Sequence, residues 1–308
     1  MKVRVNGLKV ETRDITVYDL CRDDGSSLPA FDAGAHIELT LPNGLKRQYS
    51  LVPSGSSAVY RIAVQRDRAS RGGSAWIHEN FVPGCEIDVS EPRNHFRLDE
   101  QASRSILIAG GIGVTPMLGM CDRLDELGSS WRLYYAARSR SAAAFLPELE
   151  GKAILHFDDE HHGTPMDMKA IVACAMHADD LYCCGPAPML DAFVAAVAER
   201  GGKRVHVERF AGAGAKAVEG AGFDVALARS GRRLYVPAGK TILSVLKENG
   251  VEIEYSCQDG VCGACMTHVV EGVPDHRDMV LSSEEQASNT KIMVCCSRSK
   301  SDLLILDL

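Results

Sequence analysis

The chain has 308 residues, and at roughly 100–200 residues per domain this length allows two or three packed domains. Apolar residues make up 45% and charged residues 24% of the chain, as in ordinary globular proteins, which argues against disorder, collagen and coiled coil. The net charge is −7, from 34 basic and 41 acidic residues, and a chain this acidic is a poor candidate for binding nucleic acid over a broad surface.

Neither a membrane span nor a secretory signal is expected. The longest charge-free apolar stretch, Ile106–Met120, contains glycines and a proline and is too short to cross a bilayer. Met1–Glu11 carries lysine and arginine between its apolar residues and has no hydrophobic core segment. We therefore expect a cytoplasmic protein with no membrane partner.

Residues 1–100 consist of short apolar segments separated by turn signals such as Pro42-Asn43-Gly44 and Pro83-Gly84. The expected strands are Lys2–Val10, Ile15–Cys21, His36–Leu41, Leu45–Val52, Tyr60–Val64 and Cys85–Ser90. Short strands at this spacing predict an antiparallel β-barrel.

Two segments of the predicted barrel suit a flavin. Arg47-Gln48-Tyr49-Ser50, at the end of a strand, offers a ring to lie against the flavin, a hydroxyl and a guanidinium. It resembles the Arg-x-Tyr-Ser motif of the ferredoxin-reductase superfamily. Ser70-Arg71-Gly72-Gly73-Ser74 precedes a helix-like stretch at Trp76–Asn80 and supplies backbone amides, hydroxyls and a cation for an anion. Each segment alone is compatible with a structural role, and together they indicate a flavin site.

From about residue 101 to residue 210 the pattern changes to strands alternating with helices. The expected strands are Ser105–Ala109, Trp131–Ala137, Ile154–Phe157, Asp180–Cys184 and Arg204–Glu208. The expected helices are Pro116–Leu127 with Thr115 as N-cap, one from Pro165 capped by Thr164, and Pro186–Arg200. This alternation predicts an α/β doubly wound, mostly parallel sheet that binds ligands beyond the carboxyl ends of its strands.

Two strand–helix turns in this region suit a pyridine nucleotide. In Ala109–Pro116 the glycines let phosphates approach the backbone, although Pro116 replaces the third glycine of the dinucleotide fingerprint. The loop matches Gly-Gly-x-Gly-x-Thr-Pro of the reductase superfamily, and Tyr182–Leu190 contains that superfamily's Cys-Gly-Pro signature. The resemblance places Cys184 near the nicotinamide carbon that donates hydride. No histidine neighbours Cys184 in the sequence, so we expect a positioning group and not a nucleophile.

Residues 211–222 are mostly alanine and glycine, a composition that predicts a flexible linker. After Phe223 the sequence predicts a hairpin around Ser230-Gly231 and a helix from Thr241 to Asn249, followed by a cysteine-rich loop. The chain has 11 cysteines, which is an odd number, and we expect no export signal in this sequence. Both points argue against a disulfide framework.

The cysteine loop has the spacing of plant-type [2Fe–2S] ligation: Cys257-x4-Cys262-x2-Cys265 and a distant Cys295. Zinc usually takes paired Cys-x2-Cys knuckles, of which only one is present, and buried free thiols are the other alternative. The segments closely resemble plant-type ferredoxin signatures, whose Met-Val-Cys pattern selects Cys295 as fourth ligand. The adjacent Cys296 leaves that choice ambiguous.

Taken together, the segments resemble the phthalate dioxygenase reductase family, which includes vanillate demethylase reductases. The resemblance covers essentially the whole chain, with an FMN-binding barrel at 1–100, an NADH-binding domain at 101–210, a linker at 211–222 and an α+β (β-grasp) ferredoxin domain at 223–308. It implies a reductase that passes electrons from NADH through FMN and [2Fe–2S] to a Rieske-type oxygenase. Nothing in the sequence demands more than a monomer, which is the state we expect.

The resemblance also implies which residues form the sites. Arg138 and Ser139 would meet the ribose or adenine, Asp158 would touch the nucleotide, and Tyr49 and Phe210 would lie on opposite faces of the flavin. Cys184, Thr115 and Ser50 are the candidate catalytic residues. The full cofactor-binding set is Arg47, Tyr49, Ser50, Val64, Gly72, Gly73, Ser74, Gly110, Gly111, Gly113, Thr115, Arg138, Ser139, Asp158, Cys184, Gly185, Pro186 and Phe210.

Two alternatives stay open at this point. The first is an FAD-containing reductase for a non-Rieske oxygenase, although the compact barrel shows no obvious site for an adenylate half. The second is a redox-sensing flavo-iron–sulfur protein whose nucleotide domain regulates. NADH is preferred over NADPH because no dense basic pocket for a 2′-phosphate is evident.

Overall fold

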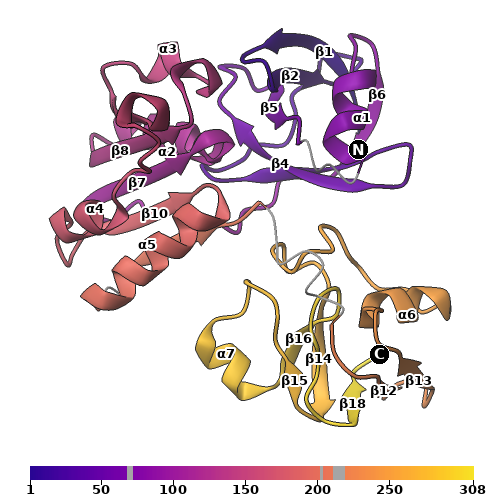
Figure 1. Ribbon diagram of the computed structural model, residues 1–308. Coiled ribbons are helices and arrows are strands. Elements are labelled where there is room, and N and C mark those ends of the chain that lie inside the picture. Colours follow the sequence, from indigo (N-terminus) through magenta and orange to yellow (C-terminus); the bar gives the residue numbers. More distant parts are fainter. Residues whose placement is uncertain (68–71, 202–203, 211–218) are drawn as a thin grey trace. The chain divides into compact units, whose positions relative to one another are not determined.

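The computed structural model describes residues 1–67, 72–201, 204–210 and 219–308. The chain divides into two compact units, Met1–Glu208 and Arg209–Leu308 (Figure 1). The expected anion-binding residues Ser70 and Arg71, and residues 211–218 of the expected linker, lie outside the described residues.

The first unit begins with a closed antiparallel barrel of six strands. They are β1 (Lys2–Val10), β2 (Ile15–Cys21), β3 (His36–Thr40), β4 (Lys46–Val52), β5 (Tyr60–Gln65) and β6 (Glu86–Val89), in the order β1-β2-β5-β4-β3-β6. Apolar residues such as Val5, Leu39 and Ile62 fill its interior, as the alternation in the sequence requires. Helix α1 (Gly73–Asn80) follows β5 and buries Ile77 in the same core. The expected barrel is confirmed.

A five-stranded parallel sheet follows, in the order β11-β10-β7-β8-β9 (Figure 1). Its strands are β7 (Arg104–Gly110), β8 (Ser130–Ala137), β9 (Ala153–Phe157), β10 (Asp180–Cys184) and β11 (Val205–Glu208). Its helices are α2 (Val114–Glu126), α3 (Leu146–Leu149), α4 (Met168–Cys174) and α5 (Ala187–Arg200). The chain leaves β7 first toward β9 and later toward β11, so the strand order reverses between β7 and β10. Ligands bind at such a switch point.

Alternate residues of β7 face opposite layers. Leu107 and Ala109 share a core with α2, whereas Ile106 and Ile108 share a second core with α4 and α5. Both faces of the sheet are thus covered, which explains why its strands read as continuous apolar runs. The predicted doubly wound sheet is confirmed.

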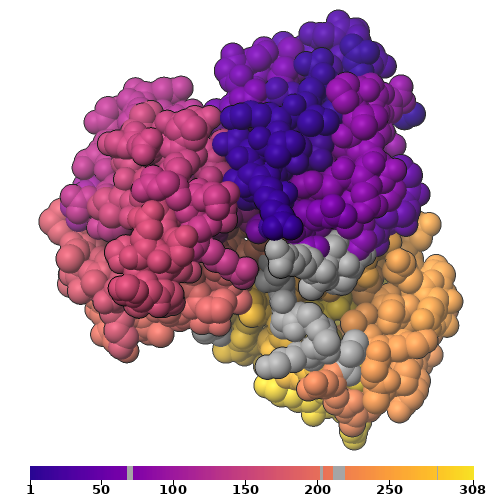
Figure 2. Space-filling view, turned by 45° about the horizontal axis from the view of Figure 1, so that its top comes forward, coloured from indigo at the N-terminus to yellow at the C-terminus, as the bar shows by residue number. Residues whose placement is uncertain are grey.

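Helix α2 also packs against the barrel. Its Met117 and Met120 lie in one buried cluster with Ile15 and Val52 of the barrel and Leu107 of the sheet. The space-filling view shows the two parts of this unit adjoining directly, the barrel in indigo to purple and the sheet region in magenta (Figure 2). A shared core makes the barrel and the sheet one compact unit.

Two predicted helix starts are wrong. Thr115 is not the N-cap of α2: Gly113 takes that place, and the Thr115 hydroxyl donates to the Ile112 carbonyl inside the first turn at 2.9 Å. Thr164 does not cap the next helix, because α4 begins at Met168 after Asp167, whose carboxylate accepts the N–H of Ala170 at 3.1 Å. An aspartate is at least as good a cap as threonine, so the later start is the one stabilised.

The second unit is a mixed sheet covered by a helix. The sheet order is β13-β12-β18-β14-β16, with β12 and β18 parallel, and α6 (Ile242–Glu248) packs Leu243 and Leu246 into its core. Its strands are β12 (Phe223–Leu227), β13 (Arg233–Val236), β14 (Met266–Glu271), β16 (Lys291–Met293) and β18 (Leu303–Leu306). The remaining elements are α7 (Ser283–Ser288) and a small pair, β15 (Pro274–Asp275) with β17 (Arg298–Ser299). The expected α+β ferredoxin fold is confirmed.

We predict that Gly34→Ala destabilises the first unit by more than the roughly 1–3 kcal/mol that a strained backbone conformation alone costs, because a steric clash adds to that strain. Gly34 has φ +86°, and a Cβ there would lie 2.1 Å from the backbone oxygen of Phe96. Both tryptophans, Trp76 and Trp131, belong to this unit, so urea unfolding followed by their fluorescence isolates its stability. The matched control Gly25→Ala has φ +67° but no neighbouring atom within 4 Å, and it should cost less. Equal losses would contradict the steric argument.

Candidate functional site

The two glycine-containing turns of the sheet touch each other at the switch point. The register of β7 and β10 places Ala109 opposite Cys184. A Cβ at Gly113 would lie 2.3 Å from the Cys184 carbonyl oxygen, and one at Gly185 would lie 3.1 Å from the Gly110 Cα. Only glycine permits this approach, which leaves backbone N–H groups at the start of α2 for a phosphate.

Gly110 of the first turn and Pro186 of the second also lie against each other. A Cβ at Gly110 would lie 2.7 Å from the Pro186 side chain, whereas one at Gly111 would meet nothing within 4 Å. Thr115 is buried with its hydroxyl committed to Ile112. The structure therefore gathers the predicted residues Gly110, Gly113, Cys184, Gly185 and Pro186, and their contact with a nucleotide stays a prediction.

Cys184 is fully buried opposite Glu208 of β11, and the two side chains are hydrogen-bonded. Burial raises the pKa of the Cys184 thiol well above its usual value, so the thiol stays neutral and donates to the carboxyl group. A neutral thiol is a poor nucleophile, which agrees with the positioning role predicted for Cys184.

Glu208 is a site residue that sequence reasoning missed. Burial raises the pKa of its carboxyl group to about 8, and the hydrogen bond from Cys184 opposes that shift. Its Oε2 is buried without a hydrogen-bond partner. Glu208 stands at the carboxyl end of a parallel strand, which is the one signal in the sequence that could have identified it.

The second group of predicted nucleotide residues lies at the ends of β8 and β9. The Asp159 N–H donates to the Arg138 carbonyl oxygen at 3.1 Å, which joins the two strand ends. The Ser139 hydroxyl is 3.0 Å from that of Ser141, and Asp158 lies 3.6 Å from His156. Arg138, Ser139 and Asp158 therefore occupy adjacent strand ends, on the same edge of the sheet as the glycine turns.

The predicted flavin residues lie on β4 and at the start of α1. A Cβ at Gly73 would lie 2.3 Å from Nε of Arg47, so the guanidinium packs directly on this glycine. Gly72 has φ +93°, and the Ser74 hydroxyl accepts the N–H of Asp67 at 3.2 Å. Arg47 and the glycine turn are thus brought together, as an anion site requires.

Ser50 and His36 carry buried polar atoms beside β4 that a polar ligand could satisfy. They face each other across β3 and β4, both are buried, and neither Oγ of Ser50 nor Nε2 of His36 has a hydrogen-bond partner. Burial, reinforced by the nearby His95 and Arg93, lowers the pKa of His36 to about 4, so its ring is neutral. Unpaired buried polar groups are costly, and the polar edge of a flavin ring fits this need.

The other predicted flavin residues have different surroundings. Tyr49 packs against the barrel core, and burial raises the pKa of its hydroxyl. Val64 lies entirely within that core and contributes its carbonyl to a 3.0 Å contact with Nε2 of His78. Phe210 is 44% exposed and belongs to the second unit. The stacking of Tyr49 and Phe210 on a flavin stays a prediction.

The four predicted cluster ligands converge in the second unit. The Cys257 thiol is hydrogen-bonded to Cys262 and Cys295, and Cys265 is hydrogen-bonded to Cys295. These contacts lower the pKa of Cys257 to about 2 and raise those of Cys262 and Cys295. Neighbouring thiolates cannot all ionise without a cation among them, and iron with soft sulfur ligands meets that condition.

The loop backbone also fits a cluster. Gly260 and Gly263 have φ of +73° and +74°, and the Asp259 N–H donates to the Cys257 sulfur at 3.3 Å. Amides that donate to sulfur stabilise thiolate ligands. The Cys296 thiol is hydrogen-bonded to Cys295, and its Sγ lies 3.8 Å from the Met293 carbonyl and 2.4 Å from where a Cβ at Gly260 would stand. The choice of Cys295 over Cys296 as fourth ligand stays a prediction.

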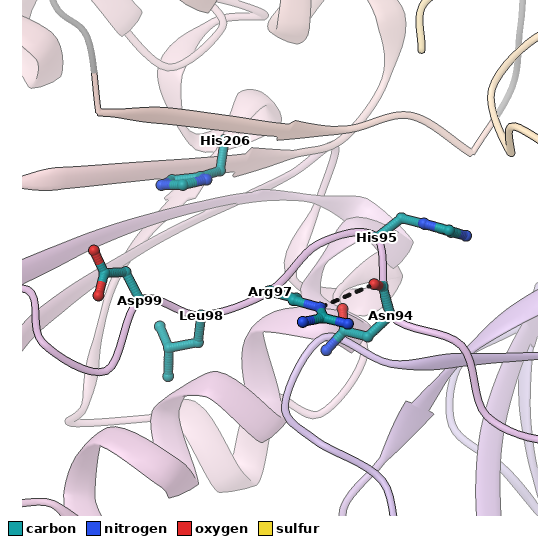
Figure 3. A pocket seen from close by; sticks show the side chains of 6 residues that line it. All are labelled: Asn94, His95, Arg97, Leu98, Asp99 and His206. Carbon is teal, nitrogen blue, oxygen red and sulfur yellow. Dashed lines mark hydrogen bonds between the residues drawn. The ribbon is translucent and has the colours of Figure 1, made fainter. Parts of the chain in front are cut away.

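One open pocket lies beside some of these groups: its His95 ring is 5.6 Å from that of His36. It is lined by Asn94, His95, Arg97, Leu98, Asp99 and His206 (Figure 3). The His206 ring stacks on Tyr182 at 4.3 Å and contacts Asp180 at 3.0 Å. The pocket contains none of the predicted site residues, and the glycine turns are better supported as the chemical site because buried unpaired groups gather near them.

The histidines beside Asp158-Asp159-Glu160 take part in ring stacking. His161 stacks on His156 with ring centroids 4.3 Å apart, in the short 3₁₀ turn Asp158–His161. Within the described ranges, no group of three or more His, Cys, Asp or Glu side chains is arranged around a single metal-ion position. No described helix has the length and apolarity needed to cross a membrane.

Comparison with known proteins agrees with this geometry. Residues 225–300 match the family model of the 2Fe-2S iron-sulfur cluster binding domain. The phenoxybenzoate dioxygenase subunit beta of Ectopseudomonas oleovorans is 49% identical over 100% of this chain and 97% of its own length.

Several solved structures match the whole chain, among them a reductase and a self-sufficient monooxygenase. Phthalate dioxygenase reductase superimposes with a TM-score of 0.77 at 38% identity, and the match includes 98% of its chain. That protein is described as a modular structure for electron transfer from pyridine nucleotides to [2Fe-2S]. An intact type IV self-sufficient cytochrome P450 monooxygenase superimposes with a TM-score of 0.86 at 37% identity. The chain spans 41% of that longer protein.

A barrel, a nucleotide-type sheet and a 2Fe-2S domain in one chain define a modular iron–sulfur oxidoreductase. The chain belongs to the phthalate dioxygenase reductase family, as its sequence motifs led us to expect. It is an oxidoreductase, the reductase component of an oxygenase system.

We predict that Glu208 makes the first unit less stable as the pH rises. Its pKa of about 8 in the folded state exceeds the ordinary value of 4.5, so its contribution is complete below pH 4.5 and is lost as the pH rises to about 8. Glu208→Gln should flatten this part of the pH dependence in urea unfolding followed by tryptophan fluorescence. The exposed Glu199→Gln is the control and should retain the wild-type slope. Parallel slopes for wild type and Glu208→Gln would refute the assignment.

We predict that Cys295 and Cys296 respond differently to substitution. Cys295→Ala removes a thiol that contacts Cys257 and Cys265, so iron content and visible absorption should be lost. Cys296→Ala removes a thiol directed at Met293 and Gly260, so both signals should persist. Iron analysis of the purified variants measures the difference. Loss of iron from Cys296→Ala alone would reverse the ligand assignment.

Proposed function

We propose that this protein passes electrons from NADH through FMN and a [2Fe–2S] cluster to a Rieske-type oxygenase. The observation that carries the proposal is the contact of the Gly110–Gly113 and Cys184–Pro186 turns, in a unit whose core also includes the flavin-type barrel. When bound, FMN accepts hydride from NADH and releases electrons singly, and the cluster carries single electrons. The protein supplies binding, orientation and exclusion of water.

The chain's own residues divide this work. Arg47, Gly73 and Ser74 would hold the FMN phosphate, with Ser50 and Tyr49 along its ring. FMN is preferred to FAD on the compactness of the barrel. The touching glycine turns would hold the nicotinamide half of NADH, and Arg138 and Ser139 its ribose or adenine.

Cys184 and Glu208 would orient the nicotinamide. The neutral Cys184 thiol donates a hydrogen bond to the Glu208 carboxyl group, which fixes both side chains beside the turns. The unpaired Oε2 of Glu208 is then available to hold a proton or to accept a hydrogen bond from a carboxamide. The Cys184 side chain and the Oε2 atom of Glu208 are buried, which helps to keep water from this part of the site.

The acceptor is supported by the relatives. Their names describe subunits of dioxygenases and demethylases, and an oxygenase partner follows from the family. A Rieske-type partner is the more specific proposal, together with a monomeric, cytoplasmic protein that has no nucleic-acid or membrane partner. The net charge of −7 disfavours binding to nucleic acid. It is compatible with docking to a basic surface on the oxygenase partner.

A second acceptor class has its own support. The self-sufficient P450 monooxygenase contains a region that superimposes on the whole of this chain, so the same modules also occur within a non-Rieske oxygenase. Release of the flavin and measurement of its mass separates FMN from FAD. An NADH oxidation assay with the co-purified oxygenase and aromatic acids identifies the acceptor.

We predict that Cys262→Ser leaves flavin reduction by NADH intact and abolishes transfer to a one-electron acceptor. The substitution removes one cluster thiol from the second unit, whereas the nucleotide and flavin groups lie in the first. Anaerobic absorption spectra follow flavin bleaching, and cytochrome c reduction follows one-electron transfer. The exposed Cys174→Ser is the matched control and should reduce cytochrome c normally.

Three outcomes distinguish the alternatives. Rapid bleaching of the wild-type flavin by NADH supports the reductase, whereas bound flavin that stays oxidised supports the redox sensor. Normal cytochrome c reduction by Cys262→Ser would contradict the proposed order of carriers.

A further inference from the structure

Arg140 lies at the edge of the sheet where the ribose end of the nucleotide is proposed to bind. It begins the 3₁₀ turn Arg140–Ala142, two residues beyond Arg138. Its Nη1 is 3.6 Å from Glu150 and its Nε is 3.4 Å from Glu160. Its guanidinium carbon stands 4.6 Å above the Phe157 ring. Arg138 is the neighbouring arginine at this strand end, so the ion pairs of Arg140 affect how much positive charge is available to a bound nucleotide.

The surroundings of Arg140 are acidic. Asp158, Asp159 and Glu160 form one exposed turn at the end of β9, and the Asp159 N–H ties this turn to Arg138 at 3.1 Å. Two carboxylates, those of Glu150 and Glu160, lie against the Arg140 guanidinium, and Asp158 and Asp159 add two more negative charges to the same turn. A 2′-phosphate would bring about 1.5–2 further negative charges into this group. The uncharged 2′-hydroxyl of NADH brings none, and a carboxylate can accept its hydrogen bond.

We propose that Glu150 and Glu160 make the protein select NADH over NADPH, because they occupy the guanidinium that would otherwise bind a 2′-phosphate. Arginine is the side chain best suited to phosphate, through its planar set of N–H donors. In this position Arg140 would favour NADPH if Glu150 and Glu160 were absent. The inference rests on the proposed function and adds the residues that set its coenzyme specificity.

The direct test is the double variant Glu150→Gln/Glu160→Gln, which keeps side-chain size and removes two negative charges. Exposed ion pairs contribute little to stability, so the fold should tolerate both changes. We expect the ratio of kcat/KM for NADPH to that for NADH, measured by anaerobic flavin reduction, to rise about tenfold. Added salt should also reduce the preference of the wild type for NADH over NADPH, because screening weakens the repulsion between the carboxylates and the 2′-phosphate.

The chain offers a close control at the other end of the sheet. Arg123, in the last turn of α2, is also held by two glutamates, Glu100 at 2.7 Å and Glu126 at 3.0 Å. Glu100→Gln/Glu126→Gln makes the same change in net charge and should leave the coenzyme ratio unchanged. Adding Arg140→Ala to the Glu150→Gln/Glu160→Gln variant should remove its gain, because the released guanidinium is the proposed phosphate ligand.

The outcomes separate this inference from the proposed function. If NADH reduces the wild-type flavin but the ratio of Glu150→Gln/Glu160→Gln stays at the wild-type value, the specificity assignment is overturned and the reductase function stands. An equal rise of this ratio in the Glu100→Gln/Glu126→Gln control would show that the change in net charge alone explains the effect. That result would also overturn the specificity assignment. Failure of NADH to reduce the wild-type flavin would refute the proposed function and this inference with it.

Discussion

The first unit depends on the burial of helix α2 on two sides at once. Met117 and Met120 lie in a cluster that contains Val52 of the barrel and Leu107 of the sheet. Because one buried cluster serves both parts, neither can move away without exposing apolar surface at a cost of about 25 cal/mol per Å². The same helix begins at the Gly111–Gly113 turn, which contacts β5 of the barrel. Packing therefore fixes the nucleotide turn against the barrel that would hold the flavin, and supplies the proximity that hydride transfer requires.

Local patterns were enough to predict the frame. Lys2–Val10, Ile15–Cys21 and Asp180–Cys184 have the bounds that alternation and apolar runs indicate. Helix starts were less predictable because several residues near each start are able to cap. Asp167 prevails over Thr164 only because its carboxylate reaches the N–H of Ala170, and one-dimensional spacing does not rank these two.

The site was predictable only where its residues share a motif. Gly110, Gly113 and Cys184 could be found because each lies within a recognisable strand–helix turn. Glu208 was missed because its properties come from a tertiary contact: the parallel register places it opposite Cys184, and burial then raises its pKa. The ion pairs of Arg140 with Glu150 and Glu160 are likewise absent from any local pattern. Charge and burial at long sequence separation are therefore what a structure adds.

Three buried polar groups at the proposed binding positions would gain stability from a bound ligand. Ser50, His36 and Glu208 each bury a polar atom with no hydrogen-bond partner, and such atoms cost about 1–3 kcal/mol each. Proteins usually satisfy these groups, and exceptions concentrate at functional positions. All three belong to the unit that would hold flavin and nucleotide. A ligand that supplied the missing partners would recover part of that cost on binding, so the same atoms that weaken the empty unit would make its stability depend on the cofactor.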